Sequence, residues 1–162
     1  MQTEIITARL VLNNLSEDDY EFICSLVNSK GWLEFIGNRN VHSKQDAIEY
    51  IRRLRNTPNL YYWVVTLKNS TTAIGIISFL KRSYLEHFDI GFAFLPQYNG
   101  HGYAYEAAEK VLSIASNKTE YATILATTVP QNEKSIRLLT KLGMHFEKEI
   151  EADHQKIYVF SK

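Results

Sequence analysis

The sequence predicts a mixed α/β domain of the α+β class, with a central, mixed but mostly antiparallel sheet of about seven strands and helices on both faces. Three observations predict it. Runs rich in aromatic and β-branched residues alternate with segments whose apolar residues recur every three or four positions. The elements follow in the order β-α-α-β-β-β-α-β-α-β-β, in which short turns join neighbouring strands. The length of 162 residues fits a single domain over residues 1–162.

The N-terminal part of the chain contains one predicted strand and two predicted helices. The strand covers Glu4–Leu12, and a short helical turn covers Trp32–Ile36 between the two helices. Each helix starts with a serine that is followed three residues later by an aspartate, which is the spacing of a capping box. The two pairs are Ser16 with Asp19 and Ser43 with Asp46.

The middle of the chain reads as three strands and a helix. Tyr61–Leu67 and Ala73–Leu80 flank a polar turn and should pair as a hairpin. Phe88–Leu95 follows as a third strand, which ends at a proline. Ala104–Ala115 carries apolar residues at the spacing of an amphipathic helix.

The C-terminal part adds a strand, a helix and a last hairpin. Tyr121–Val129 reads as a central strand because both of its faces carry apolar residues. It should pair in parallel with Phe88–Leu95 through a right-handed crossover. Gly143 is placed to end the following helix in the left-handed conformation. Met144–Glu151 and Gln155–Phe160 then form an antiparallel hairpin.

Composition and charge exclude several classes of protein. The 18 basic residues balance the 18 acidic ones, whereas a protein that neutralises phosphates carries a basic excess, so nucleic acid is not expected as a partner. No run approaches the roughly 18 apolar residues of a membrane helix, and residues 1–9 lack a signal-peptide pattern. No spacing of histidines and cysteines predicts a metal site. The single cysteine, Cys24, lies among apolar residues, and a cytoplasmic protein is the expectation.

The turn between Phe88–Leu95 and Ala104–Ala115 carries the clearest chemical signal. It contains Gly100 and Gly102, which allow a positive φ and a close approach of a ligand to the backbone. The N–H groups at the start of the following helix favour an anion such as a pyrophosphate. No Gly-Lys-Ser/Thr follows, as a P-loop requires, and a dinucleotide-binding turn belongs earlier in a βαβ chain. A plain turn with a helix cap is the remaining alternative.

The residues around this turn resemble the GNAT superfamily of N-acetyltransferases and, within it, the ribosomal-protein-alanine (Rim-type) branch. Asn99–Ala104 fills the family turn Arg/Gln-x-x-Gly-x-Gly/Ala with asparagine at its first position, and Gln97–Gly102 offers a second frame. Other segments resemble the branch too, so that the likeness covers almost the whole chain, and their order and spacing are more specific than any one of them. These segments are Thr7–Leu12, Asp89–Phe92, Pro130–Ser135 and Leu142–Met144.

The resemblance implies that the chain binds acetyl-coenzyme A. In the family, the strand before the turn has a β-bulge and diverges from the next parallel strand, and pantetheine pairs with its backbone. Phe92, Phe94 and Leu95 stand at those positions. Asn132 matches the family asparagine that reaches the pantetheine arm, although a helix N-cap also explains it, and Ser135 should lie near the thioester. Turn residues should wrap the pyrophosphate with backbone N–H groups: Asn99, Gly100, His101, Gly102, Tyr103 and Ala104.

The resemblance also implies transfer of the acetyl group to a primary amine. A base must remove the ammonium proton, because a protonated amine has no lone pair. Asp89 and Glu34 are the candidate bases, and a solvated charged cluster is the alternative interpretation of Asp89. Leu139 stands where many members carry a tyrosine that protonates the leaving thiolate. Ser135 is therefore the candidate acid, directly or through water.

The acceptor is the least determined part of the resemblance. The Rim-type branch implies a protein α-amino group, such as the N-terminus of a ribosomal protein, while other members acetylate small amines, including antibiotics and polyamines. Trp32–Asn40 and Tyr84–Phe88 should line the acceptor site. Rival interpretations are a GNAT module that binds coenzyme A without turnover, and an interaction domain without a cofactor. Self-association is common in the family, so a homodimer is compatible with the resemblance.

Overall fold

The computed structural model describes residues 1–152 and 154–162 of the chain. Its strands form one eight-stranded sheet in the order β1-β2-β3-β4-β5-β6-β8-β7. Neighbouring strands are antiparallel except for β5 and β6, which confirms a mixed, mostly antiparallel sheet. The strands are β1 (Glu4–Ile6), β2 (Leu10–Asn14), β3 (Leu60–Leu67), β4 (Ala73–Lys81), β5 (Phe88–Phe94), β6 (Leu125–Thr128), β7 (His145–Ala152) and β8 (Gln155–Ser161).

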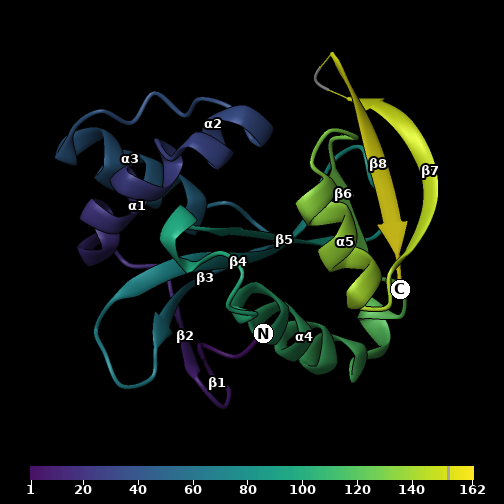
Figure 1. The fold of residues 1–162 in the computed structure, drawn as a ribbon, viewed down its shortest axis with the longest axis horizontal. Coiled ribbons are helices and arrows are strands. Elements are labelled where there is room, and N and C mark those ends of the chain that lie inside the picture. The colour runs from purple at the N-terminus through teal and green to yellow at the C-terminus, as the bar shows by residue number, and fades with distance from the viewer. Residues whose placement is uncertain (153) are drawn as a thin grey trace.

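Helices cover both faces of the sheet, as predicted. One face is covered by α1 and α3 and the other by α4, while α5 lies beside β6 (Figure 1). The helices are α1 (Tyr20–Val27), α2 (Lys30–Phe35), α3 (Lys44–Arg55), α4 (Tyr103–Ser116) and α5 (Glu133–Lys141). Short 3-10 turns are η1 (Glu17–Asp19), η2 (Pro96–Tyr98) and η3 (Thr119–Tyr121). In the described part of the chain, no helix is both long and apolar enough to cross a membrane.

The sheet separates two hydrophobic cores, one under each layer of helices. Successive residues of a strand point to opposite faces, and β3 shows this directly: Trp63 and Val65 pack on the α4 side, and Val64 packs on the α1 and α3 side. All three side chains are buried. The α4 core is the larger of the two and extends to Leu139 of α5.

The predicted N-terminal caps and the predicted glycine at a helix C-terminus are confirmed where bonds between neighbouring residues determine them. Helix α3 begins at its capping box, because the Asp46 N–H donates to Ser43 Oγ at 3.1 Å and the Ser43 N–H donates to the Asp46 carboxylate at 2.9 Å. Ser16 donates its N–H to Asp19 in the same way at 2.8 Å, but this box opens η1 rather than α1. Gly143, after α5, has a φ of 76°, as predicted.

Two predicted strands are wrong in their extent. Glu4–Leu12 is not one strand but two, β1 and β2, because the chain turns at residues 7–9, where the Thr7 N–H donates to the Leu10 carbonyl at 3.0 Å. This is why the sheet has eight strands. Tyr121–Val129 is extended only over β6, since its first residue closes η3. The last hairpin is confirmed; its predicted turn at 152–154 includes residue 153, which lies outside the described residues.

The parallel pair of β5 and β6 is confirmed, but it is very short. A single residue pair, Asp89 with Leu125, joins the two strands. The pairing of β5 with β4, in contrast, runs without a shift of register from Phe88 to Phe94. Within the described residues β5 therefore has no bulge against β4, in contrast to the expectation from the family. The strands β5 and β6 still diverge after their one contact, and this gap positions the site.

Candidate active site

The edge of β5 that faces the gap is built from backbone groups. Because the Leu95 N–H donates to the Ile74 carbonyl, Gly75 and Phe94 form a non-hydrogen-bonded pair of the antiparallel ladder. The alternation of the ladder then turns the N–H and C=O groups of Phe92 and Phe94 away from β4. They point to the side on which β6 has diverged, and such groups are available to a ligand that lies along the strand.

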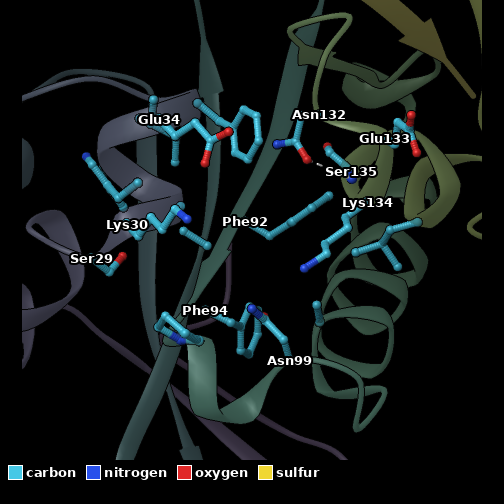
Figure 2. A pocket seen from close by; sticks show the side chains of 18 of the residues that line it. Ser29, Lys30, Glu34, Phe92, Phe94, Asn99, Asn132, Glu133, Lys134 and Ser135 are labelled. Carbon is cyan, nitrogen blue, oxygen red and sulfur yellow. Dashed lines mark hydrogen bonds between the residues drawn. The ribbon is translucent and has the colours of Figure 1, made fainter.

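A cavity of about 580 Å³, which we call the gap cavity, lies along this edge. Its base is β5, with Phe92 and Phe94, and α2 and α5 form its two sides (Figure 2). The turn after β5 closes one end through Pro96, Asn99 and Ala104. Helix α5 contributes its N-cap Asn132 together with Lys134, Ser135 and Arg137, and α2 contributes Lys30 and Glu34.

The glycine turn adopts the predicted conformation. Gly100 has a φ of 83° and Gly102, the N-cap of α4, has a φ of 80°. Residues with a Cβ rarely adopt such φ angles, so the turn strongly favours glycine at both positions. Helix α4 consequently begins beside the gap cavity, with the first N–H groups of the helix free of intrahelical bonds. These groups and the helix dipole favour an anion at this end of the cavity.

The first turn of α4 is anchored by the N-terminal segment of the chain. Glu106 accepts hydrogen bonds from the Thr7 hydroxyl at 2.6 Å, the Arg9 N–H at 2.8 Å and the Arg9 Nε at 2.6 Å. Arg9 also donates to the carbonyl of His101 at 3.0 Å and lies over the ring of Tyr103. Burial raises the pKa of the Glu106 carboxyl, but the bonds from Thr7 and Arg9 outweigh it, so the pKa lies below its ordinary value.

The start of α5 presents one predicted pair and two basic residues that the sequence analysis missed. Asn132 caps α5, since its Oδ1 accepts the N–H of Ser135 at 3.1 Å, and both residues line the gap cavity. Lys134 points into the cavity (Figure 2), and Arg137 lines the same wall. Helical spacing of basic residues next to Asn132 could have indicated them, because phosphates are bound by such side chains.

Glu34 and Asp89, the two candidate bases, differ completely in their surroundings. Glu34 is exposed and points from α2 into the gap cavity, opposite Asn132 and Ser135 (Figure 2). Asp89 is 1% exposed and lines neither of the two cavities described here. The structure therefore supports Glu34 rather than Asp89 as a group that reaches a ligand, and it contradicts the interpretation of Asp89 as part of a solvated cluster.

The Asp89 carboxylate is instead held at the point where β5 and β6 part. Arg82 Nε donates to its two oxygens at 2.9 and 3.0 Å, and the Thr127 hydroxyl of β6 donates at 3.2 Å. Burial raises the pKa of the Asp89 carboxyl, while Arg82 and Thr127 lower it. Asp89, which also pairs with Leu125 in the sheet, thus ties β5 to β6 through its side chain.

A second cavity, of about 520 Å³, continues from the gap cavity under α2 and α3. We call it the arginine cavity, because Arg39, Arg53 and Arg82 line it and, within the described residues, no aspartate or glutamate does. Leu139 also lies in its wall, 1% exposed. The two cavities share one wall, formed by Trp32, Phe35, Ile36, Phe92, Ala93, Asn132 and Ser135.

The structure therefore brings most of the predicted site residues together. Phe92, Phe94, Asn99, Ala104, Asn132, Ser135 and Glu34 line the gap cavity, and Gly100, His101, Gly102 and Tyr103 form the turn between two of its lining residues. Leu95, like Asp89, does not line the gap cavity. Its N–H donates to Ile74 and its carbonyl accepts from Tyr98, so that both backbone groups are engaged within the fold.

Comparisons with known proteins agree with this geometry. A family model described as an acetyltransferase (GNAT) domain matches residues 9–145. A protein of Bacillus subtilis (strain 168) named uncharacterized N-acetyltransferase YnaD is 28% identical over 143 residues, which cover 88% of this chain and 83% of the relative.

Solved structures share the fold over nearly the full length. An acetyltransferase of the GNAT family from Bacillus anthracis has a TM-score of 0.82 at 24% identity, and the match covers 98% of this chain and 97% of that one. RimL, a ribosomal alpha-N-protein acetyltransferase solved in complex with coenzyme A, has a TM-score of 0.82 at 13% identity, covering 98% and 96%.

Proposed function

The chain belongs to the acetyltransferase (GNAT) domain family and is an N-acetyltransferase that uses acetyl-coenzyme A; we propose that a primary amine enters through the arginine cavity and accepts the acetyl group. One observation carries this proposal. The two cavities meet at a common wall that includes Phe92, Asn132 and Ser135. A thioester held along β5 would reach that wall from one side and an amine from the other. We also propose that residues 1–162 act as one catalytic domain.

The residues of the gap cavity fit acetyl-coenzyme A. The outward N–H and C=O groups of Phe92 and Phe94 suit the amide groups of pantetheine. The N–H groups of the turn from Asn99 to Ala104, at the start of α4, suit the pyrophosphate. Lys134 adds positive charge on the facing wall, and side chains of this kind bind phosphates. Arg137 lines the same wall but is paired with Glu133 at 3.1 Å. The cofactor supplies the acetyl group as a thioester, in which the carbon is already activated.

The reaction moves two protons, and two side chains of the gap cavity are the candidates for this. As the amine nitrogen bonds to the acetyl carbon and the carbon–sulfur bond breaks, the amine loses a proton and the departing sulfur gains one. We propose that Glu34 accepts the proton of the amine, directly or through a water molecule. We propose that the Ser135 hydroxyl, at the shared wall, protonates the sulfur, directly or through water. Asp89 and Leu95 are left out of the proposed chemistry, because they lie away from both cavities or are engaged within the fold.

The acceptor class is the finer part of the proposal. The α-amino group of a peptide or protein is the first candidate, because a structural neighbour carries the name of a ribosomal alpha-N-protein acetyltransferase. A small amine is the second, since the arginine cavity, at about 520 Å³, lies in the range of small-molecule sites. A module that binds coenzyme A without turnover is the alternative outside catalysis.

Thermal unfolding followed by an assay of thiol release tests this proposal. Coenzyme A at 100 times its Kd should stabilise the fold by about 2.7 kcal/mol. Thiol release from acetyl-coenzyme A should then depend on an added amine. Glu34→Gln should lower kcat by about 100-fold or more without changing the affinity for coenzyme A. Glu109→Gln, an exposed residue of α4, is the matched control.

Each outcome has a distinct meaning. Stabilisation by coenzyme A without thiol release from any amine would support the non-catalytic module. Absence of stabilisation at millimolar coenzyme A would contradict the assignment of the gap cavity. If Glu34→Gln retained the kcat of the wild type, Glu34 would lose its role as the base while the acetyl transfer itself would stand.

A further inference from the structure

We propose that the acceptor of this enzyme is a primary amine that also carries a carboxylate, which Arg39 and Arg53 bind in the arginine cavity. This inference rests on the proposed function, because it places the acceptor in that cavity. It excludes polycationic amines, such as polyamines, as the preferred acceptors. The amine would lie beside Asn132 and Ser135 of the shared wall and the carboxylate beside Arg39 and Arg53, since both arginines line the arginine cavity but not the gap cavity.

The charge of the arginine cavity is the first argument. Of its three arginines, Arg82 is paired with Asp89 at 2.9 Å. Within the described residues, Arg39 and Arg53 have no carboxylate within the 4.0 Å of an ion pair. Two guanidinium groups without an ion-pair partner therefore face a cavity whose described lining holds no acidic side chain, although Arg39 also hydrogen-bonds to Tyr50. Such groups bind carboxylates through parallel N–H bonds.

Unpartnered donors in the same walls are the second, independent argument. The indole Nε1 of Trp32 and the hydroxyl of Tyr62 are buried and have no hydrogen-bond partner among the described residues. Trp32 is only 5% exposed, and both residues line the arginine cavity. Burial raises the pKa of Tyr62 well above its ordinary value, so this phenol stays a donor. A buried donor without a partner costs free energy, and a ligand rich in acceptor oxygens would remove that cost.

The aromatic side chains of the cavity do not favour a cationic ligand in place of an anionic one. Aromatic faces attract cations, but here the protein itself supplies the cations. The Arg39 guanidinium lies over the Trp32 ring at 5.9 Å, and that of Arg53 lies over the Tyr50 ring at 5.3 Å. An ammonium group of a polyamine would meet these guanidinium groups and be repelled.

The two ends of the site then match the two ends of the acceptor. Glu34, an acidic side chain, points into the gap cavity next to the shared wall (Figure 2). Arg39 follows it in the chain and lines the arginine cavity. An acceptor with an ammonium group and a carboxylate would be oriented with its nitrogen toward Glu34 and Ser135. A free amino acid and a peptide with an early acidic side chain share this chemistry.

The test compares matched acids and amides as acceptors with saturating acetyl-coenzyme A. One arm pairs each common amino acid with its carboxamide, and a second pairs amidated dipeptides that end in glutamate with those that end in glutamine. Spermidine represents the polycations. We expect kcat/KM to be about 10- to 100-fold higher for the acids in at least one arm, as charge-assisted hydrogen bonds predict. The arm that responds identifies the source of the carboxylate.

Variants locate the discrimination in the cavity. In the double variant Arg39→Gln, Arg53→Gln, the ratio of acid to amide should fall to about one, because kcat/KM falls more for the acids than for the amides. The KM for acetyl-coenzyme A should stay as in the wild type, because neither arginine lines the gap cavity. Arg55→Gln, which alters an exposed arginine of α3 that lines neither cavity, should leave the ratio as in the wild type. The comparison of acids with amides in the wild type needs no variant, so a folding defect of the double variant would not weaken the test.

Three results would overturn the inference: equal or higher kcat/KM for the amides, preference for spermidine, or an unchanged ratio in a folded double variant. If thiol is released from none of these amines, the same acids and amides are added to the protein saturated with coenzyme A. A rise in Tm with the acids alone would then support the carboxylate site, and no rise would refute it. Failure of coenzyme A to bind is a different result, because it refutes the proposed function itself.

Discussion

The gap cavity and the arginine cavity meet at one wall but are built in different ways. The gap cavity presents mainly backbone groups, from the edge of β5 and from a turn in which Gly100 and Gly102 have positive φ angles. The arginine cavity presents side chains, in particular Arg39, Arg53 and Arg82, from a loop, a helix and the segment after a strand. The first surface depends on the path of the chain, and the second depends on which residues the chain carries there.

This difference matters for function, because binding of the cofactor and choice of the acceptor would depend on two different kinds of surface. A backbone surface binds any ligand with the same polar groups, and a change of side chain leaves it intact as long as the turn keeps its conformation. A side-chain surface can change its charge by a single substitution. In the proposed function, the gap cavity therefore binds the cofactor and the arginine cavity discriminates between amines.

Asp89 lines neither cavity but binds Arg82 and Thr127 in the wall of the arginine cavity, so its removal should have the largest effect on stability. Asp89→Ala leaves Arg82 without its partner and detaches Thr127 of β6. Breaking a fully buried pair lowers the free energy of unfolding by about 3–5 kcal/mol. Because the Arg82 side chain is 34% exposed, we expect a loss at the lower end of this range. Chemical denaturation measures this loss. Asp18→Ala, at an exposed position before α1, is the control and should stay within about 0.5 kcal/mol of the wild type.

A loss below about 1 kcal/mol for Asp89→Ala would place this pair among ordinary surface ion pairs. The divergence of β5 and β6 would then have to be fixed by packing alone and not by the Asp89 carboxylate. Asp89→Asn sharpens the result, since it keeps an acceptor for Arg82 and Thr127 but removes the charge. We expect its free energy of unfolding to lie between those of the wild type and Asp89→Ala.

The same division explains what the sequence could predict. Gly100, Gly102 and the cap at Asn132 act on residues next to them in the chain, and their conformation was predicted correctly. The convergence of Arg39, Arg53 and Arg82 depends on packing between segments far apart in the sequence, and nothing local indicates it. The interpretation of Asp89 as a solvated residue is wrong for the same reason, because its burial depends on β6.

Gly102→Ala tests the gap cavity alone and should have the second largest effect on stability. An L-residue at a φ of 80° is strained by about 1–2 kcal/mol, although a Cβ would have room, since its nearest neighbour is Arg9 at 3.5 Å. We expect a lower Tm and a Kd for coenzyme A that is raised by about 10-fold, with an unchanged preference among amines. Isothermal titration with coenzyme A measures the affinity.

Gly31→Ala provides the contrast for stability. Gly31 lies within α2, its added Cβ would meet nothing within 4 Å, and its φ is not positive. The exchange should stabilise the protein by about 0.5–1 kcal/mol. If Gly102→Ala left the stability as high as Gly31→Ala does, the turn would not depend on its left-handed conformation. The gap cavity would then not depend on the backbone conformation of this turn.

Glu106 tests what keeps this turn in place, and its effect should be the smallest. Hydrogen bonds from Thr7 and Arg9 hold the pKa of its carboxyl below the ordinary value of 4.5, against the effect of burial. A lowered pKa contributes stability that is present above the pKa of the unfolded chain and is lost as the pH falls through the folded value. Glu106→Gln should therefore be less stable than the wild type at pH 7, by no more than about 1 kcal/mol.

The pH dependence distinguishes this electrostatic contribution from a simple loss of packing. Below pH 4.5 the wild type should lose the contribution while Glu106→Gln does not change in this respect, so the difference in the free energy of unfolding should shrink as the pH falls. Denaturant titrations between pH 7 and pH 3 measure it. A difference that stays constant over this range would mean that Glu106 supports α4 through shape alone, and that the charge of Arg9 does not help to hold the turn in place.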